Sequence, residues 1–358
     1  MKVLLVRFSS LGDVVLVTAA VEALREALPG VHLDILTKPE FRPVFAGNRG
    51  VSGLLEWDPV DGLGSLARAV RRGEYDWIVD LHANLRTWVL RALVPGPRWS
   101  VYAKGVLRRR LAVWLRKPGL LAGQPHVVER YLSALAPLGV GSRFRKPCLF
   151  LDRGERDAAG ALLRDGGWDG RAPLIGLAPG ARWATKAWPM EHWVKLARAV
   201  VAEGAGLPVL VGGTLDRGLC ERVLRDAGVT GVNLAGSTSV RGTAAVLECC
   251  DALVANDSAP MHLAVAVGTR VVALFGPTMA GFGFSPLGDD DVALDTALAC
   301  RPCSLHGDDR CPKGHHRCLE GLEPVVVVAA LRRAPGGPRC PCCSSMPLAG
   351  RVWDPVPQ

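Results

Sequence analysis

Apolar and polar positions follow a repeated order along the chain, in which a short apolar run precedes a segment with helical spacing. Residues 2–8 (KVLLVRF) form the first run, and apolar side chains then recur every three or four positions from about Val14 to Leu28. The run is typical of a buried strand, and the recurrence is typical of an amphipathic helix. With a second strand predicted at 32–37, the chain opens on a β-α-β unit.

This order continues through most of the chain. Before residue 141 it predicts strands at 53–57 and 77–81, helices at 63–72 and about 126–138, and a basic, loop-rich region after Leu81. The pattern loosens at 141–156 and restarts with strands at 173–177, 207–211 and 231–234 and helices at 155–164, 190–202, 217–227 and 240–250. Strands that alternate with helices indicate parallel, doubly wound sheets.

The length of 358 residues favours two domains over one. We predict an α/β protein with two Rossmann-like, doubly wound parallel-sheet domains, at 1–150 and 151–334, that face a central cleft. Residues 335–358 are rich in proline, glycine and cysteine without periodicity, and we predict a disordered tail there.

The stretch 252–278 (ALVANDSAPMHLAVAVGTRVVALFGPT) is the most informative part of the second domain. It predicts a strand, a sharp loop, a short helix and a strand at 252–255, 256–259, 260–267 and 271–275. Asp257 and Ser258 are favourable N-cap residues, and Pro260 suits the first helical turn. Such a helix start attracts an anion such as a phosphate, and His262 lies one turn inside it. The alternative is an ordinary crossover helix with a capping aspartate and a core-facing histidine.

Asp13 is the candidate general base of the first domain. It follows the first strand, behind Gly12, at the start of a helix. A carboxylate in that position faces the cleft and can accept a proton from a substrate hydroxyl. The alternative role is a helix N-cap, and the two roles can coexist. No G-x-G-x-x-G follows this strand and no Walker-type lysine loop occurs, which disfavours a dehydrogenase-type dinucleotide site.

The loop PGARWATKAWP at 179–189 supplies candidate ligands for a phosphate in the second domain. A glycine turn with Arg182 and Lys186 at the end of a strand suits a diphosphate. The alternative is a solvated lysine in a loop where Trp188 only packs. Asp216, after another predicted strand, is placed to hydrogen-bond a ribose.

The formal net charge of +9 favours anionic partners, and the densest basic run lies at 98–117. No recognised nucleic-acid-binding motif accompanies this run, so we predict no nucleic-acid partner. An anionic lipid surface or an acidic glycolipid fits the charge equally well, and a simply solvated basic face also remains open. The apolar runs are shorter than the ~20 residues that span a bilayer, and no signal-peptide cleavage pattern follows the first one. We therefore predict a cytoplasmic protein.

The chain has eleven cysteines, and without a secretion signal they argue against a disulfide framework. Four lie in apolar surroundings and are predicted to be buried thiols: Cys148, Cys220, Cys249 and Cys250. Four others, with interleaved histidines, leave a structural zinc site open although their spacing is not that of a standard zinc ribbon: Cys300, Cys303, Cys311 and Cys318, with His306, His315 and His316. A weaker group follows in the tail: Cys340, Cys342 and Cys343.

Four motifs occur in order: SSLGDVVLVTAAVEALREALPG, DLHANLRT, PGARWATKAWPMEHW and NDSAPMHLAVAVGTRVVALFGPT. Over residues 1–330 they resemble glycosyltransferase family nine, whose best-known members are ADP-heptose:lipopolysaccharide heptosyltransferases. The resemblance implies a GT-B fold that binds the acceptor in the first domain and the ADP-sugar in the second. It implies inverting transfer of heptose from ADP-heptose to the lipopolysaccharide inner core, with Kdo or heptose as acceptor and with neither a catalytic metal nor a cofactor. It also implies a peripheral enzyme at the cytoplasmic face of the inner membrane.

The resemblance assigns roles residue by residue. Asp13 matches the base that deprotonates the acceptor, and Lys186 matches the lysine that binds the donor diphosphate and stabilises the leaving ADP. Asp257 matches the acidic residue at the donor sugar, and His262 the histidine at the same helix start. Arg86 of DLHANLRT matches a basic residue of the acceptor side. The remaining candidates are Arg182, Asp216, Ser258 and Ala259 on the donor side, and Ser10 and Gly12 on the acceptor side.

One departure, one further match and two alternatives accompany the resemblance. The family often has Thr-Gly after its aspartate, where this chain has Ser258-Ala259, so the approach of the backbone to the donor is left open. Gly276-Pro277-Thr278 matches a family motif without an assigned role. The alternatives are the same fold with another nucleotide-sugar or acceptor, and a nucleotide-binding module without catalysis. Such a module has no need of Asp13.

Overall fold

Two separate parallel β-sheets organise the chain, each within its own structural unit. The computed structural model describes residues 1–141, 143 and 145–332. One unit comprises Met1–Leu107 and Gly123–Phe150, and the other comprises Arg108–Ala122 and the described residues from Leu151 onward. The predicted tail at 335–358, with Cys340, Cys342 and Cys343, lies outside the described residues.

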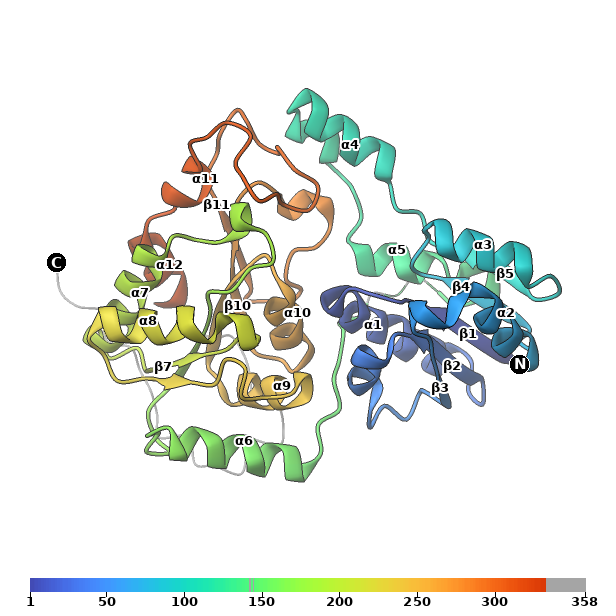
Figure 1. The fold of residues 1–358 in the computed structure, drawn as a ribbon, viewed down its shortest axis with the longest axis horizontal. Coiled ribbons are helices and arrows are strands. Elements are labelled where there is room, and N and C mark those ends of the chain that lie inside the picture. The colour runs from blue at the N-terminus through green and yellow to red at the C-terminus, as the bar shows by residue number, and fades with distance from the viewer. Residues whose placement is uncertain (142, 144, 333–358) are drawn as a thin grey trace. The chain divides into compact units, whose positions relative to one another are not determined.

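The sheet of the first unit has the order β3-β2-β1-β4-β5, and all its strand pairs are parallel. Its strands are β1 (Lys2–Val6), β2 (His32–Thr37), β3 (Gly53–Glu56), β4 (Trp77–Asp80) and β5 (Arg98–Val101). Its helices are α1 (Leu11–Ala27), α2 (Gly62–Arg72), α3 (Leu85–Leu93) and α5 (Val127–Ser133), with short 3₁₀ turns η1 (Pro39–Phe45), η2 (Pro59–Asp61) and η4 (Ala136–Leu138). Helix α1 contacts α5, and α2 contacts α3 (Figure 1).

The sheet of the second unit has the order β11-β10-β9-β6-β7-β8, again with parallel pairs only. Its strands are β6 (Leu174–Ala178), β7 (Leu207–Leu210), β8 (Val232–Asn233), β9 (Ala252–Asn256), β10 (Arg270–Phe275) and β11 (Val292–Asp295). Its helices are α6 (Arg153–Asp165), α7 (Met190–Ala202), α8 (Arg217–Ala227), α9 (Val240–Cys249), α10 (Ala259–Ala266), α11 (Arg317–Glu320) and α12 (Pro324–Arg332). The 3₁₀ turns are η5 (Ala184–Lys186), η6 (Thr214–Asp216) and η7 (Ala280–Phe282).

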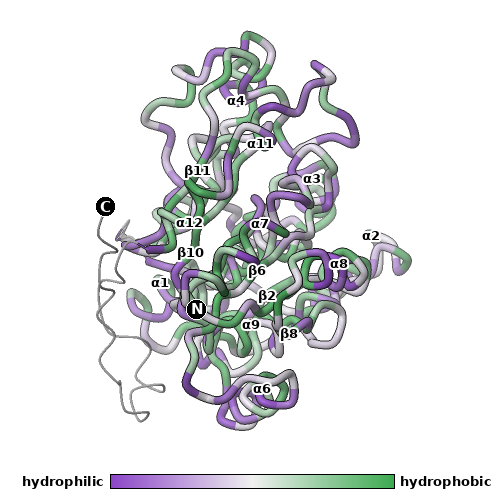
Figure 2. The backbone as a smooth tube through the Cα atoms, turned by 90° about the vertical axis from the view of Figure 1, so that its left-hand side faces the viewer, coloured by the Kyte–Doolittle hydropathy of each residue, from purple (hydrophilic) through white to green (hydrophobic). Residues whose placement is uncertain are grey.

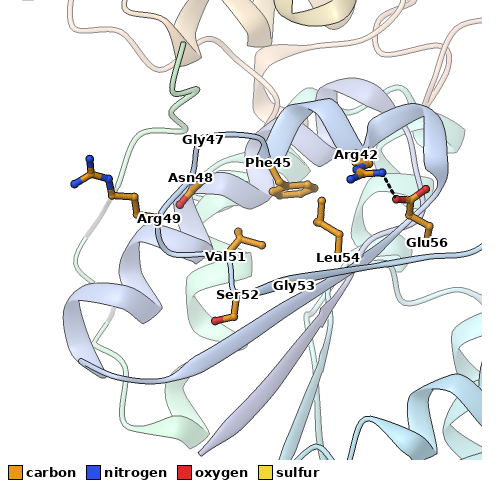
Figure 3. A pocket seen from close by; sticks show the side chains of 10 residues that line it. All are labelled: Arg42, Phe45, Gly47, Asn48, Arg49, Val51, Ser52, Gly53, Leu54 and Glu56. Atoms are coloured by element: carbon orange, nitrogen blue, oxygen red, sulfur yellow. Dashed lines mark ion pairs between the residues drawn. The ribbon is translucent and has the colours of Figure 1, made fainter. Parts of the chain in front are cut away.

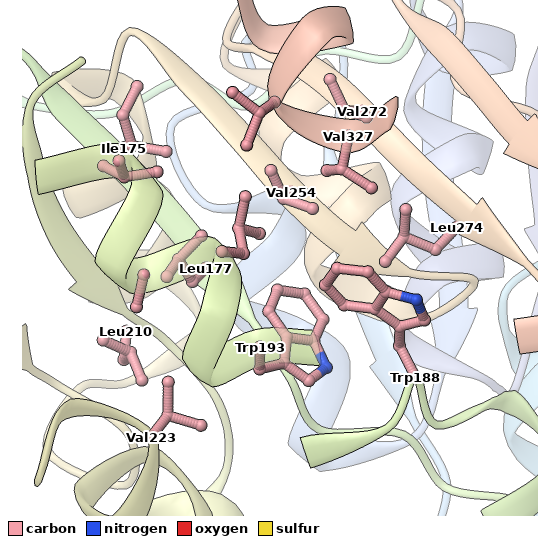
Figure 4. Close-up of a cluster of buried hydrophobic side chains, with 14 of the residues drawn as sticks. Ile175, Leu177, Trp188, Trp193, Leu210, Val223, Val254, Val272, Leu274 and Val327 are labelled. Carbon is pink, nitrogen blue, oxygen red and sulfur yellow. The ribbon is translucent and has the colours of Figure 1, made fainter. Parts of the chain in front are cut away.

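The core of the second unit forms because α7 presents an apolar stripe to its sheet. Trp193, Leu196, Ala197 and Val200 recur at helical spacing and are buried. The Trp193 ring meets that of Trp188 edge to face, with centroids 5.1 Å apart (Figure 4). The central strands are correspondingly apolar, whereas α8 is largely hydrophilic (Figure 2). Burial of these side chains therefore fixes how the helices cover this sheet.

Both sheets reverse their strand order at one point. The chain order changes direction between β1 and β4 in the first sheet and between β6 and β9 in the second. In open parallel sheets, ligands bind beyond the carboxyl ends of the strands at such a switch point. The loops that follow these four strands are therefore the ones that the fold places for chemistry.

The basic region after Leu81 is not loop-rich as predicted. It contains α3, β5, α4 (Val106–Leu115) and the 3₁₀ turn η3 (Pro118–Leu121). The segment Arg108–Ala122 belongs to the second unit, where Ala112 and Leu121 pack on Phe282. The predicted first domain, 1–150, therefore differs from the observed first unit by this segment. A few apolar contacts decide to which unit this segment belongs, and they join residues that are distant in the sequence.

Most other predicted elements agree with the structure within one to three residues. Three coincide at both ends, namely β2, α7 and α8. Elements β11, α11 and α12 were not predicted.

Of the four predicted buried thiols, Cys220 and Cys250 are buried, but Cys148 and Cys249 are only partly covered. No helix among the described residues is long and apolar enough to cross a membrane.

Candidate functional site

A carboxylate stands at the switch point of the first sheet, directly after β1. Helix α1 begins with Ser10 in an extended N-cap conformation, which places Asp13 in the first helical turn. The helix was predicted to begin near Val14, so Asp13 lies inside the helix and is not its N-cap. Asp13 Oδ2 accepts hydrogen bonds from Ser10 Oγ at 2.8 Å and from Ser10 N at 3.3 Å.

Arg7 forms an ion pair with this carboxylate from the end of β1. Its Nη2 lies 2.7 Å from Asp13 Oδ2, and the side chains are 8% and 18% exposed for Arg7 and Asp13 respectively. Arg7 also donates to the carbonyls of Ser9 at 2.7 Å and Leu81 at 2.6 Å. Burial lowers the pKa of Arg7, but the charge of Asp13 raises it and the net direction is upward, so Arg7 stays cationic. Sequence reasoning missed Arg7 as a site residue, although a charge at the end of an apolar strand was its signal.

The loop after β4 brings a second set of polar groups to the same switch point. Asp80 accepts hydrogen bonds from the backbone N–H groups of His82 at 2.8 Å and Ala83 at 2.7 Å. Asn84 then caps α3 by accepting from Thr87 N at 3.1 Å. This arrangement leaves Arg86 exposed in the first turn of α3.

His82 is a neutral group in this cationic surrounding. Its ring meets that of Phe8 edge to face, with centroids 5.2 Å apart. Burial and then the positive charges of Arg7 and Lys104 lower the pKa of His82 to about 3. His82 therefore offers an uncharged imidazole at physiological pH.

The second unit carries a lysine–carboxylate pair at its own switch point. Lys186 ends the turn η5 after β6, and Asp257 follows β9, the strand that neighbours β6 in the sheet. Lys186 Nζ lies 2.6 Å from Asp257 Oδ2, and the side chains are 15% and 11% exposed respectively. Thr278 Oγ1 donates to the same Oδ2 at 2.7 Å. The structure thus brings together three residues that are far apart in the sequence.

Asn256 holds the lysine loop beside β9. The side chain is fully buried; its Oδ1 accepts from Trp188 N at 3.1 Å and its Nδ2 donates to Pro179 O at 2.8 Å. The two ends of the loop 179–188 are therefore tied to one side chain. Sequence reasoning missed Asn256, although a polar residue at the end of the apolar run ALVAN was a signal.

Arg301 holds the loop that carries Thr278. Its guanidinium is buried and donates to the carbonyls of Gly276 and Thr278, the latter at 2.9 Å, and to Asp295 Oδ2 at 3.1 Å. Gly276 permits this loop to approach the lysine loop, because a Cβ there would lie 3.0 Å from Thr185 O and 2.8 Å from a Leu319 methyl. No motif had indicated Arg301.

The start of α10 differs from its predicted capping. Ser258 occupies the N-cap position, but its side chain makes no capping hydrogen bond and instead donates to Asn256 O at 3.2 Å. The Asp257 carboxylate accepts from Thr278 and pairs with Lys186. Ser258 is therefore the N-cap residue, as predicted, but without a capping hydrogen bond, whereas Asp257 does not cap the helix. Pro260 lies in the first turn as predicted, next to Ala259, and His262 is buried one turn further on.

The other donor-side candidates lie on the adjacent loops. Arg182 is exposed, with its guanidinium 5.4 Å from the Trp183 ring centroid. Asp216 Oδ2 accepts from Gly213 N at 2.8 Å. A Cβ at Gly180 would lie 2.4 Å from the Asp216 carboxyl, so glycine is required where these loops meet.

The cysteine- and histidine-rich segment packs on the lysine loop without forming a recognisable metal site. Thr185 Oγ1 lies 2.8 Å from Asp308 N, and the Thr185 carbonyl lies 3.0 Å from His316 Nε2. Cys300 Sγ approaches His315 Nε2 at 3.9 Å. Across residues 1–141, 143 and 145–332, no three His, Cys, Asp or Glu side chains are placed to hold a metal ion. The zinc alternative thus has no set of ligands in the described part of the chain.

An open depression of about 480 Å³ lies elsewhere on the first unit (Figure 3). Phe45, Val51 and Leu54 form its apolar part, and Arg42 pairs with Glu56 at 3.2 Å beside it. Its lining includes none of the predicted site residues. We place the chemistry at the switch points, because titratable groups with specific partners converge there.

Comparison with known proteins identifies the family of the chain. The model of glycosyltransferase family 9 (heptosyltransferase) matches residues 63–312, more than half of the chain. Lipopolysaccharide heptosyltransferase 1 of Pseudomonas aeruginosa is 28% identical over 323 residues, which cover 85% of this chain and 86% of that protein. Twelve curated proteins match significantly, and this one spans most of both chains.

Solved structures establish the fold. The glycosyl transferase family 9 protein from Veillonella parvula superposes with a TM-score of 0.76 at 23% identity, covering 92% of this chain and 95% of that one. The E. coli ADP-heptose lps heptosyltransferase II superposes with a TM-score of 0.71 at 22% identity, covering 92% and 97%. The predicted GT-B fold of two Rossmann-like domains is confirmed by these likenesses and by the two parallel sheets.

Proposed function

Because this chain belongs to glycosyltransferase family 9, the heptosyltransferases, we propose that it transfers heptose from ADP-heptose to the inner core of a lipopolysaccharide. The names of the relatives support the donor and the acceptor class. The observation that carries the proposal is the position of Asp13 and Lys186, the two residues that match the family's base and its diphosphate lysine. Each stands beside a switch point of its own sheet.

On the acceptor side, Asp13 is the proposed general base of an inverting transfer. Its carboxylate accepts the proton of the acceptor hydroxyl while that oxygen attacks the anomeric carbon of heptose, on the face opposite the leaving ADP. The Arg7 guanidinium, 2.7 Å away, stabilises the negative charge of Asp13 and fixes its direction. Ser10 and Gly12 form the backbone around this carboxylate, and the exposed Arg86 pairs with an acidic sugar or phosphate of the acceptor.

On the donor side, Lys186 is the proposed partner of the diphosphate. Its ammonium group and the start of α10, formed by Ser258 and Ala259, meet the charge that develops on the leaving ADP. Asp257 holds Lys186 and contacts the donor sugar. The other donor contacts are proposed for Arg182, Asp216 and His262. In this mechanism the protein's own cations and backbone dipoles stabilise the leaving group, so the reaction needs no metal.

We also propose that the protein works in the cytoplasm at the inner face of the inner membrane. The acceptor is a membrane glycolipid, and the basic region after Leu81 suits its anionic groups. Nucleic acid is not proposed as a partner, because the basic region carries no recognised binding motif.

The test is calorimetric titration of the protein with ADP, UDP and GDP. We expect ADP to bind preferentially, and Lys186→Ala to weaken ADP binding at least about 10-fold, as loss of a charge-assisted contact would. Lys195→Ala is the matched control, because Lys195 is an exposed lysine of α7 away from these loops. ADP-heptose turnover with a lipopolysaccharide-core acceptor then measures the transfer itself.

Two other results would redirect the assignment. Preference for UDP or GDP would keep the fold but exchange the donor for another nucleotide-sugar. ADP binding without any turnover by the wild type would favour a nucleotide-binding module without catalysis. Absence of any nucleotide binding would contradict the proposal.

A further inference from the structure

Helix α4 exposes an apolar face. Four large side chains, at spacing i, i+4, i+7 and i+8, lie on one side of the helix and are exposed by 74%, 39%, 78% and 43%: Leu107, Leu111, Trp114 and Leu115. The opposite side is anchored, since Ala112 is buried in the cluster with Leu121 and Phe282. The helix is therefore packed on the second unit, and its exposed side chains are not exposed because the helix is detached. They form a surface that is held in place from behind.

The charged residues of the stretch that carries this face have one sign. Residues 81–128 contain nine arginines and lysines but no aspartate or glutamate. The net charge of this stretch therefore equals that of the whole chain, +9. Arg110, Arg116 and Lys117 are exposed on α4 and just beyond it. Arg108 donates to Ala122 O at 2.9 Å and thereby ties the helix to the following turn. An apolar face whose own helix and flanking residues carry only positive charges favours a partner that is both apolar and anionic.

We propose that α4 is an interfacial helix that inserts Leu107, Leu111, Trp114 and Leu115 into the headgroup region of an anionic lipid bilayer. Leucine and tryptophan on one face with arginine and lysine around them match the chemistry of that interface. A helix of ten residues cannot span the bilayer, so it lies in the plane of the surface. A second copy of this chain is a poorer partner, because two such faces would oppose cation to cation.

Helix α3 carries the same combination within the first unit. Leu85, Trp88 and Val89 are exposed at spacing i, i+3 and i+4, and the Arg91 guanidinium lies 6.0 Å from the Trp88 ring centroid. We assign it the same kind of contact, to be tested by its own variant. The inference deepens the proposed function, since it names the surface that meets the membrane in which a glycolipid acceptor lies.

The experiment measures co-sedimentation of the full chain with vesicles of phosphatidylcholine alone and with phosphatidylglycerol added, in the absence of nucleotide and acceptor. We expect binding to the anionic vesicles. The double variant Leu111→Ser/Trp114→Ser should lower the partition coefficient at least 10-fold. The variant Arg110→Gln/Arg116→Gln/Lys117→Gln should also lower it, by roughly fivefold per charge at low salt. The matched control is Val60→Ser/Val325→Ser, which removes exposed valines from η2 and α12 and should leave binding unchanged.

Three results would overturn the inference. The first is absence of binding to anionic vesicles, and the second is binding that Leu111→Ser/Trp114→Ser leaves intact. The third is a concentration-dependent dimer in light scattering that this double variant abolishes, which would assign the face to a second copy. ADP titration of the same variants separates this inference from the proposed function, because the vesicle assay can fail while ADP binding persists. Trp88→Ser, measured in parallel, applies the same test to α3.

Discussion

The two switch points carry the same three kinds of group, a carboxylate, a cation and a hydroxyl. They differ in whether the carboxylate or the cation is more exposed. After β1, a carboxylate has an arginine and a hydroxyl as partners: Asp13, Arg7 and Ser10. After β9, a carboxylate has a lysine and a hydroxyl: Asp257, Lys186 and Thr278. The distances are alike, 2.7 and 2.6 Å for the ion pairs and 2.8 and 2.7 Å for the hydroxyls.

The difference lies in which member is more accessible. In the first pair the carboxylate is more exposed than its cation, 18% against 8%, whereas in the second the cation is slightly more exposed, 15% against 11%. Arg7 is held by two backbone carbonyls and cannot turn toward a ligand without losing them. Among the residues that the structure describes, Lys186 donates to one backbone carbonyl only, Asp257 O at 3.4 Å, so it is held less firmly than Arg7. The first pair is therefore suited to present its carboxylate, and the second to present its cation.

The largest expected effect comes from removing the accessible carboxylate. Asp13→Asn should lower kcat for heptosyl transfer by about 10²- to 10⁴-fold, because the amide cannot take the proton of the acceptor. The ADP dissociation constant should stay within about twofold of wild type, because the substitution lies in the first unit. Steady-state kinetics and calorimetry measure the two quantities.

A folding control accompanies that substitution. Asp13→Asn leaves Arg7 without its carboxylate, so a lower melting temperature is expected. ADP binding by the same preparation reports whether the second unit remains folded. Retention of most of the activity would refute the role of Asp13 as base and with it the contrast between the two pairs.

The second expected effect concerns the buried hydroxyl. Thr278→Val removes the hydrogen bond to Asp257 with little change in shape, and should weaken ADP binding about 10-fold, since a buried bond to a charged group contributes about 1.5–3 kcal/mol. Thr278→Ser keeps the hydroxyl and is the control. Equal ADP affinity for both variants would mean that the position of Lys186 does not depend on Thr278.

The sequence could predict the fold because strand and helix periods are local. In the second unit the continuous apolar strands and the helical spacing of apolar residues predicted β9 within one residue and α7 and α8 at both ends. The region of α3 and α4 failed because both helices turn apolar side chains outward among arginines, which obscures the usual inward stripe. Neither helix was visible from periodicity alone.

The candidate site could be predicted only where a motif supplied it. Asp13, Lys186 and Asp257 stand in motifs, and the structure places the latter two in contact. Arg301 and Asn256 donate to backbone carbonyls that are distant in the sequence. Arg301 and Thr278 are 23 residues apart, and Asn256 and Pro179 are 77 residues apart. No local pattern encodes such pairings, because they arise from tertiary approach.

The third prediction concerns the pKa of His82, which burial and then the neighbouring positive charges lower in the folded first unit. With a folded pKa of about 3 and an unfolded value near 6.5, the unfolded chain binds the extra proton as the pH falls below 6.5. Stability is therefore lost over that window, and wild type should lose about 1 kcal/mol more than His82→Phe between pH 7 and 5.5. Denaturant unfolding at both values measures this. Between pH 7 and 8 the two proteins should change alike, and a parallel loss below pH 6.5 would show that His82 is not the group responsible.

The smallest expected effect is the counterpart of Thr278→Val in the first unit. Ser10→Ala removes the 2.8 Å hydrogen bond to Asp13, but Ser10 is exposed and water can replace its hydroxyl. Arg7 still holds the carboxylate at 2.7 Å. We therefore expect kcat to fall only about two- to fivefold, equivalent to less than about 1 kcal/mol, with ADP binding unchanged. Ser9→Ala is the matched control, since Arg7 uses the Ser9 carbonyl and not its side chain. A loss of kcat for Ser10→Ala as large as that for Asp13→Asn would mean that the Ser10 hydroxyl, and not Arg7, holds the carboxylate in place. The two switch points would then both depend on a hydroxyl, and would differ only in having an arginine or a lysine as the cation.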